Sequence, residues 1–233
     1  MSKINIYLDT ANLSEINLFK DKNYIKGFTT NPLLMKKAKI KNYINFTKEI
    51  TQTIKKKPIS FEIFADDTRG IISQGLKLGK LSKNIYVKVP IKNSKGKSNL
   101  KAIKELNSQG VKLNITAIFT FSQLKKIIKI IDKDEEIILS IFAGRIADTL
   151  RDPEILFKKT KRLIRKYKKI KLLWASTREI FSITQAQRSG ADIITIDPNI
   201  LKKLSLKNFN LEKYSTKTSK EFYKAAMESK YFI

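Results

Sequence analysis

The sequence contains no cysteine and no histidine among its 233 residues. The missing cysteines exclude disulfides, thiol nucleophiles and thiolate metal sites. The missing histidines exclude an imidazole general base, a Ser-His-Asp triad and any zinc or iron centre held by histidine. An enzyme with this composition must therefore work with lysine, arginine, carboxylate, hydroxyl or phenol groups.

Long apolar runs are also missing. No stretch reaches the roughly 18 consecutive apolar residues that indicate a membrane-spanning helix. The first residues, MSKINIYLD, lack the apolar segment of a secretory signal. We therefore expect a cytoplasmic protein that does not associate with membranes.

Basic residues outnumber acidic ones by 48 to 21, which gives a formal net charge of +27. Only seven of these basic residues are arginine, and the lysines recur along most of the expected helices. Such a distribution is more typical of a solvated surface than of a nucleic-acid site, so we expect no specific nucleic acid, and nucleic-acid binding remains the remote alternative. The positive field should attract phosphorylated anions in general.

Short apolar runs alternate with segments of helical periodicity along the whole chain. This alternation is typical of parallel βαβ units, and eight of them fit the α/β class as a (β/α)8 barrel, which usually has about 250 residues. An open doubly wound sheet is the alternative, but no G-x-G-x-x-G follows the first run. The expected strands are 4–9, 27–31, 59–65, 85–90, 112–119, 137–144, 171–176 and 192–197.

Helical periodicity covers segments such as 33–54, 99–109, 122–132 and 153–167. Ser122 and Asp152-Pro153 are typical helix starts, whereas Gly110 and Gly190 suit helix ends. No linker or composition break divides the chain, so we predict one domain over residues 1–233. Residues 217–233 should form a terminal helix that packs over the barrel or onto a neighbouring subunit.

Polar side chains end most of the apolar runs. A lone strand-end Asp or Asn is more often a turn former or cap than a catalyst. In a (β/α)8 barrel, however, the chemistry lies at the carboxyl ends of the strands, and residues i and i+2 share a face. Because seven of the eight runs bring polar groups to that end, we interpret them as one site. Its members are Asp9, Thr30, Asn31, Glu62, Lys88, Asn114, Thr116, Ser140, Ser176 and Arg178.

Lys88 stands in the middle of the apolar run IYVKVP, at 85–90. Lysine is rarely buried, so Lys88 either extends to the outer edge of the sheet or has a chemical task. A free lysine, with a pKa of about 10.4, is almost fully protonated at neutral pH, and an apolar strand favours the neutral amine. A Schiff-base nucleophile is the chemical interpretation, with Asp9 or Glu62 moving protons.

Two of the seven arginines, Arg145 and Arg178, follow neighbouring strands. Guanidinium groups bind phosphate oxygens in bidentate fashion, so the pair could clamp a phosphate, and Ser176 could add a hydroxyl. Surface ion pairs are the other interpretation of these arginines.

Several motifs in order resemble one family, the transaldolases, and most closely the short transaldolase and fructose-6-phosphate aldolase subfamily. The resemblance covers about residues 4–226. The motifs are LDTAN (8–12), GFTTNP (27–32), EIFA (62–65), VKVP (87–90), NITAIFTFSQ (114–123), SIFAGRIAD (140–148) and ASTRE (175–179).

The resemblance implies a (β/α)8 barrel and a cofactor-free, metal-free reaction through an imine on Lys88. It implies that Asp9 assists carbon–carbon cleavage and that Glu62 and Thr116 position a water. It also implies binding roles: Asn31, Asn114 and Ser140 for substrate hydroxyls, and Arg145, Ser176 and Arg178 for the sugar phosphate.

Two positions separate the activities within this family. Transaldolases resemble the chain in having Glu at position 62 and Phe at position 142, where fructose-6-phosphate aldolases tend to have Gln and Tyr. Since Phe142 cannot donate a proton, the resemblance favours a transaldolase of the pentose phosphate pathway. It would move a dihydroxyacetone unit from fructose 6-phosphate or sedoheptulose 7-phosphate to an aldose phosphate. Cleavage that releases dihydroxyacetone is the alternative, and a homo-oligomer is expected.

Overall fold

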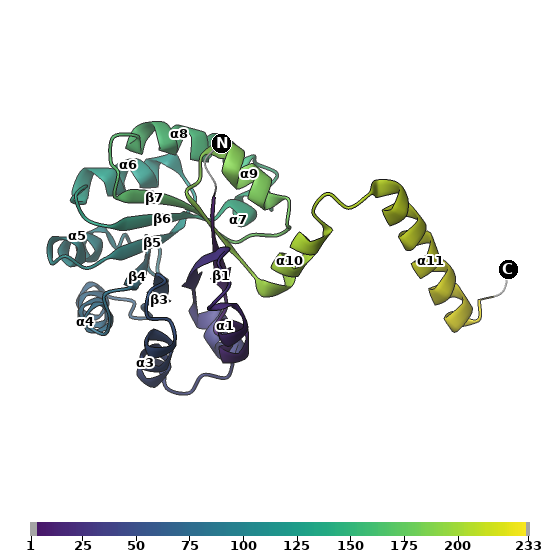
Figure 1. The fold of residues 1–233 in the computed structure, drawn as a ribbon. Helices are drawn as coiled ribbons and strands as arrows, with labels where there is room; N and C mark the ends of the chain where they lie inside the picture. The colour runs from purple at the N-terminus through teal and green to yellow at the C-terminus, as the bar shows by residue number, and fades with distance from the viewer. Residues whose placement is uncertain (1–3, 232–233) are drawn as a thin grey trace.

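A computed structural model gives the structure of the protein, which is described here for residues 4–231. Its centre is a closed barrel of eight parallel strands, each paired with its neighbours in chain order, and β8 pairs back onto β1 (Figure 1). This arrangement confirms the predicted (β/α)8 barrel and its single domain. The strands are β1 (Asn5–Asp9), β2 (Ile25–Thr29), β3 (Ile59–Glu62), β4 (Ile85–Pro90), β5 (Leu113–Ile118), β6 (Ile137–Ile141), β7 (Ile170–Trp174) and β8 (Ile193–Ile196).

All of the helices except α11 lie around this barrel. The helices are α1 (Leu13–Phe19), α2 (Pro32–Lys37), α3 (Tyr43–Thr53), α4 (Thr68–Gly79), α5 (Leu100–Ser108), α6 (Phe121–Ile130), α7 (Ala143–Ala147), α8 (Pro153–Ile164), α9 (Ser182–Ser189), α10 (Pro198–Lys202) and α11 (Leu211–Ser229), with a 3-10 turn at Lys203–Leu206. Within residues 4–231, none of these helices is both long and apolar enough to cross a membrane.

Apolar side chains from both faces of the strands explain why the barrel closes. The main core lies between the strands and the helices and contains fully buried isoleucines such as Ile59, Ile115 and Ile141. A smaller cluster, including Tyr7 and Ile138, fills the barrel below the polar strand ends. The Tyr7 ring needs Gly27 opposite it, because a Cβ at position 27 would lie 2.5 Å from the ring. This apolar cluster therefore fills the barrel interior beneath the polar residues at the strand ends.

Helix boundaries differ from the sequence prediction at two places. The periodic segment 33–54 is two helices, because Lys39 adopts a left-handed conformation (φ 55°) between α2 and α3. Helix α6 begins one residue before Ser122, since Thr120 and Gln123 form a capping box around its first turn. The predicted start at Asp152-Pro153 and the predicted end at Gly190 are both confirmed, and Gly190 has φ 87°.

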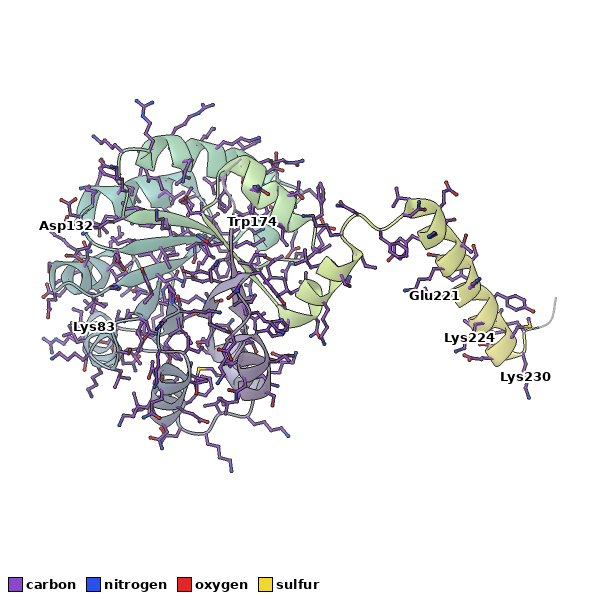
Figure 2. All side chains as sticks on the ribbon, in the orientation of Figure 1. Lys83, Asp132, Trp174, Glu221, Lys224 and Lys230 are labelled. Carbon is purple, nitrogen blue, oxygen red and sulfur yellow. The ribbon has the colours of Figure 1, made fainter. Side chains whose placement is uncertain are left out.

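The C-terminal helix departs from the barrel. Helix α11 begins at Leu211, six residues before the predicted start at 217, because Asn210 caps it by accepting from the backbone N–H of Lys213. None of its residues is buried, and it projects away from the barrel (Figure 1). Figure 2 shows Glu221 and Lys224 on this isolated helix, far from Trp174 in the barrel. The helix therefore does not pack over its own barrel, and the last two residues of the predicted extension, 232–233, lie outside the described residues.

Candidate active site

Strand register places three polar residues at one level of the barrel. Glu62 of β3 is level with Lys88 of β4, and Lys88 is level with Asn114 of β5. Lys88 is only 6% exposed, so it does not extend to the outer surface. Its Nζ lies 3.0 Å from the Glu62 carboxylate and donates to the backbone carbonyl of Thr30 at 3.1 Å.

With these two acceptors, the lone pair of a neutral Lys88 amine stays free to react. A neutral primary amine has two N–H donors and one lone pair, so Glu62 and Thr30 can hold both donors while the lone pair stays available. The pairing with Glu62 also compensates the burial of an ammonium, which would otherwise be costly. Lys88 can therefore rest as an ammonium paired with Glu62, and it can act as a nucleophile once the ammonium has lost a proton.

A cavity of about 110 Å³ opens above Lys88 at the carboxyl ends of the strands. Seven of the eleven residues predicted for catalysis or substrate binding line it: Asp9, Asn31, Lys88, Ser140, Phe142, Arg145 and Ser176. Its remaining lining residues are Thr29, Leu173, Ala175 and Thr195. The structure therefore brings most of the predicted site together around the lysine.

Asn114 and Thr116 are not among the residues that line this cavity. Asn114 is fully buried, accepts a hydrogen bond from Ser140 at 2.6 Å and donates one to Ser60 at 3.0 Å. Asn114 therefore orients the Ser140 hydroxyl. The Thr116 hydroxyl is buried and has no hydrogen-bond partner among the described residues. A buried hydroxyl of this kind is a natural place for a bound water or a substrate oxygen.

Asp9 lies at the rim of the cavity, where it accepts a hydrogen bond from Thr29 at 2.7 Å. Burial raises the pKa of the Asp9 carboxyl; Lys88 and the Thr29 hydrogen bond oppose this effect, whereas Asp197 and Glu62 add to it. Because the Thr29 hydroxyl donates to Asp9, the Thr195 hydroxyl 2.5 Å away must donate to Thr29. The hydroxyl chain makes Asp9 a well-held carboxyl that can take up a proton.

Thr29 and Thr195 were absent from the predicted site. Thr29 is the first threonine of the GFTTN run, directly before the predicted site residues Thr30 and Asn31. Thr195 lies in DIITID, the one strand for which no polar site residue was predicted. Strand parity could have identified Thr195, because it stands two residues before Asp197 on the same face.

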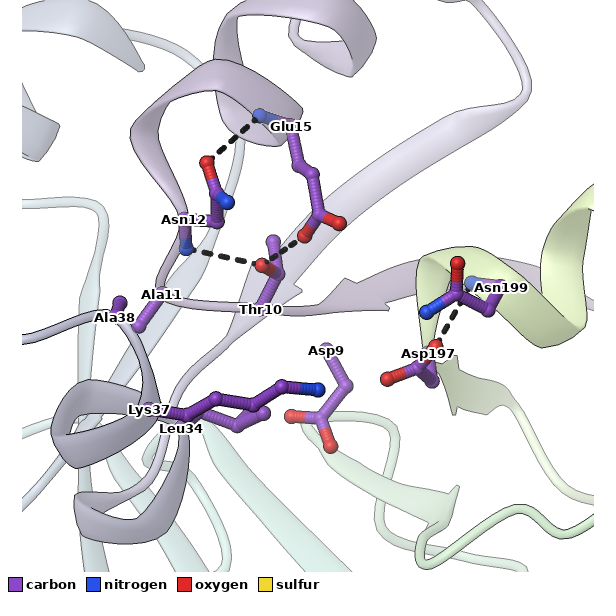
Figure 3. Close-up of a pocket in the computed structure, with 10 residues that line it drawn as sticks. All are labelled: Asp9, Thr10, Ala11, Asn12, Glu15, Leu34, Lys37, Ala38, Asp197 and Asn199. Atoms are coloured by element: carbon purple, nitrogen blue, oxygen red, sulfur yellow. Dashed lines mark hydrogen bonds between the residues drawn. The ribbon is translucent and has the colours of Figure 1, made fainter.

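A second cleft, of about 130 Å³, adjoins the cavity at Asp9. Asp197, which follows β8, and Lys37, on α2, line it together with Asp9. Figure 3 shows the Lys37 amine facing the space between the two carboxylates. Asp9 therefore has the Lys88 cavity on one side and a charged cleft on the other.

The predicted phosphate end depends on a close approach between two loops. A Cβ on Gly144 would lie 1.7 Å from the backbone oxygen of Ser176, so only glycine lets these loops meet. The contact brings Arg145 and Ser176 into the same cavity wall, with the Arg145 guanidinium 5.7 Å from the centre of the Phe142 ring. The arrangement provides one cation and one hydroxyl for an anion.

Arg178 is not part of that wall. Its guanidinium donates to Asp148 at 3.3 Å and 2.5 Å, and both side chains are about half exposed. The pair corresponds to the surface ion pair that the sequence left open for this arginine. Glu62, the remaining predicted residue, contacts Lys88 but is not in the cavity lining.

Residues 4–231 contain no group of three or more acidic side chains close enough to hold a metal ion. The chemistry that the described side chains offer is amine, carboxyl, hydroxyl and guanidinium chemistry.

Comparison with known structures identifies the fold. A phosphonomutase-like structure from Burkholderia cenocepacia matches with a TM-score of 0.56 and 7% identity, covering 98% of this chain and 93% of that one. A structure of KGPDC from Streptococcus mutans matches with a TM-score of 0.52 and 10% identity, covering 83% and 88%. At such low identity, these likenesses show the barrel fold alone.

Sequence comparison identifies the family. Residues 6–231 match the family model described as transaldolase/fructose-6-phosphate aldolase. A probable transaldolase of Nitrosopumilus maritimus is 35% identical over 201 residues, which cover 85% of this chain and 86% of that protein. A probable transaldolase of Methanococcus vannielii is 32% identical over 212 residues, covering 89% and 94%. The chain therefore belongs to the transaldolase/fructose-6-phosphate aldolase family.

Proposed function

We propose that the protein is a cytoplasmic transaldolase of the pentose phosphate pathway. It would transfer a dihydroxyacetone unit from fructose 6-phosphate or sedoheptulose 7-phosphate to an aldose phosphate, through a Schiff base on Lys88. The observation that carries the proposal is the buried Lys88 amine, held by Glu62 and Thr30 and facing a cavity with Asp9 at its rim. No other described lysine lines that cavity.

In the first half of the reaction, the neutral Lys88 amine attacks the ketone carbon of the donor. Proton transfers through Glu62 and a water near Thr116 convert the carbinolamine into an iminium and release water. Asp9 then takes the proton of the C4 hydroxyl as the C3–C4 bond breaks. The bonding electrons enter the iminium to give an enamine, and the aldose phosphate leaves.

The second half reverses these steps with a new aldehyde. The enamine carbon attacks the acceptor, and protonated Asp9 returns its proton to the new hydroxyl. Hydrolysis of the iminium then frees Lys88. Arg145 and Ser176 would hold the phosphate of both aldoses, because they form one wall of the cavity. Arg178 would join them only after leaving Asp148.

Transfer is favoured over simple cleavage by Phe142. Its ring lies in the cavity wall, packed against Phe119 with the ring centres 5.7 Å apart, and it has no proton to give. The enamine would therefore persist until an acceptor aldehyde arrives. The alternative function, cleavage that releases dihydroxyacetone, requires another proton donor at this position.

The experiment that tests the Schiff base is trapping with borohydride in the presence of fructose 6-phosphate, followed by peptide mass spectrometry. We expect a dihydroxyacetone-derived secondary amine on the peptide with Lys88, and none in Lys88→Met. Lys171→Met is the matched control, because Lys171 is an exposed lysine of β7. An adduct that survives in Lys88→Met, or no adduct with either donor sugar, would contradict the proposal.

The acceptor requirement separates the two activities. Fructose 6-phosphate alone should give at most one turnover, and addition of erythrose 4-phosphate should start continuous formation of sedoheptulose 7-phosphate. Steady release of dihydroxyacetone without an acceptor would instead favour the aldolase alternative.

A homo-oligomer is the expected assembly, and helix α11 supports it. The helix carries exposed apolar side chains, among them Leu211 (79% exposed) and Phe222 (71% exposed). In proteins, a helix gains most of its stability from the packing of its apolar face. The occupant that we propose for this face is the barrel of a second copy of the chain.

A further inference from the structure

Asp197 is the acidic residue that lies beside Asp9 in the barrel. Strands β1 and β8 pair in parallel, with Leu8 level with Ile196, so the next residues, Asp9 and Asp197, leave the barrel side by side. Neighbouring strands are about 4.8 Å apart, and both carboxylates belong to the lining of one cleft. Neither the imine chemistry nor the phosphate contacts proposed above use Asp197.

Several other charges face Asp9 from the surrounding elements. On the cavity side these are Lys88 of β4, Glu62 of β3 and Arg145 of α7; on the cleft side they are Lys37 of α2, Glu15 of α1 and Asp197. The Glu15 carboxylate accepts a 2.5 Å hydrogen bond from Thr10. Among these groups, Lys88 is the one whose charge changes in the cleavage step of the proposed reaction.

When the positive charge on Lys88 is lost, the negative charge of Asp197 has more influence on the protonation of Asp9. While Lys88 is an ammonium or an iminium, its positive charge favours an ionised Asp9. When the carbon–carbon bond breaks, the iminium becomes a neutral enamine and this support for the Asp9 charge disappears. The charge of Asp197 then disfavours ionised Asp9 and retains the proton on it.

We propose that Asp197 is a positioning residue whose negative charge keeps the proton on Asp9 after cleavage, so that the proton is available for the acceptor. This role rests on the proposed function of Asp9 and Lys88. It acts through Asp9 and involves no contact between Asp197 and the substrate. Asp197 would promote cleavage by making Asp9 a better proton acceptor.

Asp197 also has a structural role, as the N-cap of α10. Its side chain caps α10 by accepting from the backbone N–H of Asn199 at 2.7 Å, and Pro198 follows it. Asn and Ser cap helices about as well as Asp. Asp197→Asn therefore removes the charge and keeps the cap.

Asp152 offers a matched control. It caps α8 in the same way, by accepting from Glu154 at 2.8 Å, and is also followed by proline. Asp152 lines neither the cavity nor the cleft. Asp152→Asn thus repeats the change of charge and cap away from Asp9.

The test is carbon-13 NMR of the protein with labelled aspartate carboxyls, in which Asp9→Asn identifies the Asp9 signal. In Asp197→Asn and Asp197→Ser, the pKa of Asp9 should move downward, and in Asp152→Asn it should not. The acid limb of kcat/KM for the donor should move downward with it, and the partition of the enamine toward the acceptor should fall. High salt should narrow the difference, because the cleft is open to solvent.

The inference is overturned if Asp9 titrates alike in the native protein and in Asp197→Asn while both remain folded. It is equally overturned if Asp197→Asn and Asp152→Asn move the titration by the same amount, since this would reflect net charge alone. The titration needs no substrate, so its result is independent of borohydride trapping. An absence of trapping with a shifted Asp9 titration would reject the proposed transaldolase and leave the coupling between Asp9 and Asp197 intact.

Discussion

At the scale of the residue, the site holds charges where an ordinary core would hold apolar groups. Asp9 faces Glu62 and Asp197 as well as Lys88, and the sum of burial and like charge raises its pKa. A group whose charged form is disfavoured by folding weakens the folded state once it ionises. Such a cost at a functional site is the usual origin of a trade-off between stability and activity.

Asp9→Asn should therefore stabilise the protein while removing its activity. The amide can still accept from Thr29, so the change mainly removes the charge. Because the folded pKa of Asp9 lies above its unfolded value, the destabilisation that Asn relieves is absent at low pH and appears as pH rises through these values. We expect a gain of about 1 kcal/mol in the free energy of unfolding at pH 7, which urea denaturation at pH 4 and pH 7 measures. A variant less stable than the native protein at pH 7 would contradict this reasoning.

Single residues also mark how far the sequence alone could go. The position of polar residues at the ends of the apolar runs predicted that Lys88, Asp9 and Ser140 belong to one site, because a barrel gathers the carboxyl ends of its strands. It could not distinguish Arg145, which reaches the cavity, from Arg178, which pairs with Asp148. That choice depends on a partner 30 residues away in the chain, and no local pattern contains it.

At the scale of the element, two helices are joined by a buried carboxylate. Glu154 of α8 is 3% exposed and accepts from Arg188 of α9 at 2.9 Å and 2.8 Å. Hydrogen bonds from Arg188 are the main reason why the pKa of Glu154 is lowered. A buried carboxylate that loses its partner is strongly destabilising.

Arg188→Met should lower the melting temperature by a few degrees near pH 7. A depressed carboxyl pKa contributes stability above its unfolded value and loses it as pH falls through the folded value. The difference between variant and native protein should therefore shrink in acid, which calorimetry over pH 3–7 measures. Arg162→Met, on the exposed face of α8, is the control. An equal loss in both variants would mean that general charge, and not Glu154, is responsible.

The loops after β6 and β7 provide a second prediction at this scale. Gly144→Ala places a Cβ against the Ser176 backbone, so the loops must separate. We expect a loss of about 2 kcal/mol in stability and about a tenfold or larger loss of kcat/KM for phosphorylated donors. Ala147→Ser, which adds one atom at an exposed position of α7, is the control. Native kinetics in Gly144→Ala would show that the close approach does not position Arg145.

Most elements could be predicted because apolar runs and periodicity are local. All eight strands were expected within a few residues of their observed limits. The break between α2 and α3 was not, because Lys39 takes up φ 55° inside a periodic segment without a glycine or proline to mark it. The direction in which α11 leaves the barrel could not be predicted from the sequence either. Periodicity indicates that a helix has an apolar face, but it does not indicate what covers that face.

At the scale of the whole molecule, the barrel is self-contained and α11 is not. The barrel carries its own core, whereas α11 has exposed side chains all round and leaves the barrel through residues 207–210. The exposed apolar side chains of α11 that we consider are Leu211, Tyr214 and Phe222, which share one side of the helix, and Tyr223 and Met227, which lie on another side. Exposed apolar surface on a projecting helix is typical of an interface between proteins.

If a second copy of the chain covers these side chains, replacing aromatic residues among them should dissociate the assembly. We expect native protein to sediment well above the 26.9 kDa of one chain, and the double variant Phe222→Ser with Tyr223→Ser to sediment as a smaller species. Lys217→Ser with Lys220→Ser is the matched control, because both are exposed lysines of the same helix. Sedimentation velocity over a range of concentrations measures all three proteins.

Borohydride trapping on Lys88 should persist in the dissociated variant, because every described residue of the cavity comes from one barrel. If the native protein sediments as a single chain at all concentrations, no second copy covers the exposed apolar side chains of α11, and the proposed homo-oligomer is rejected.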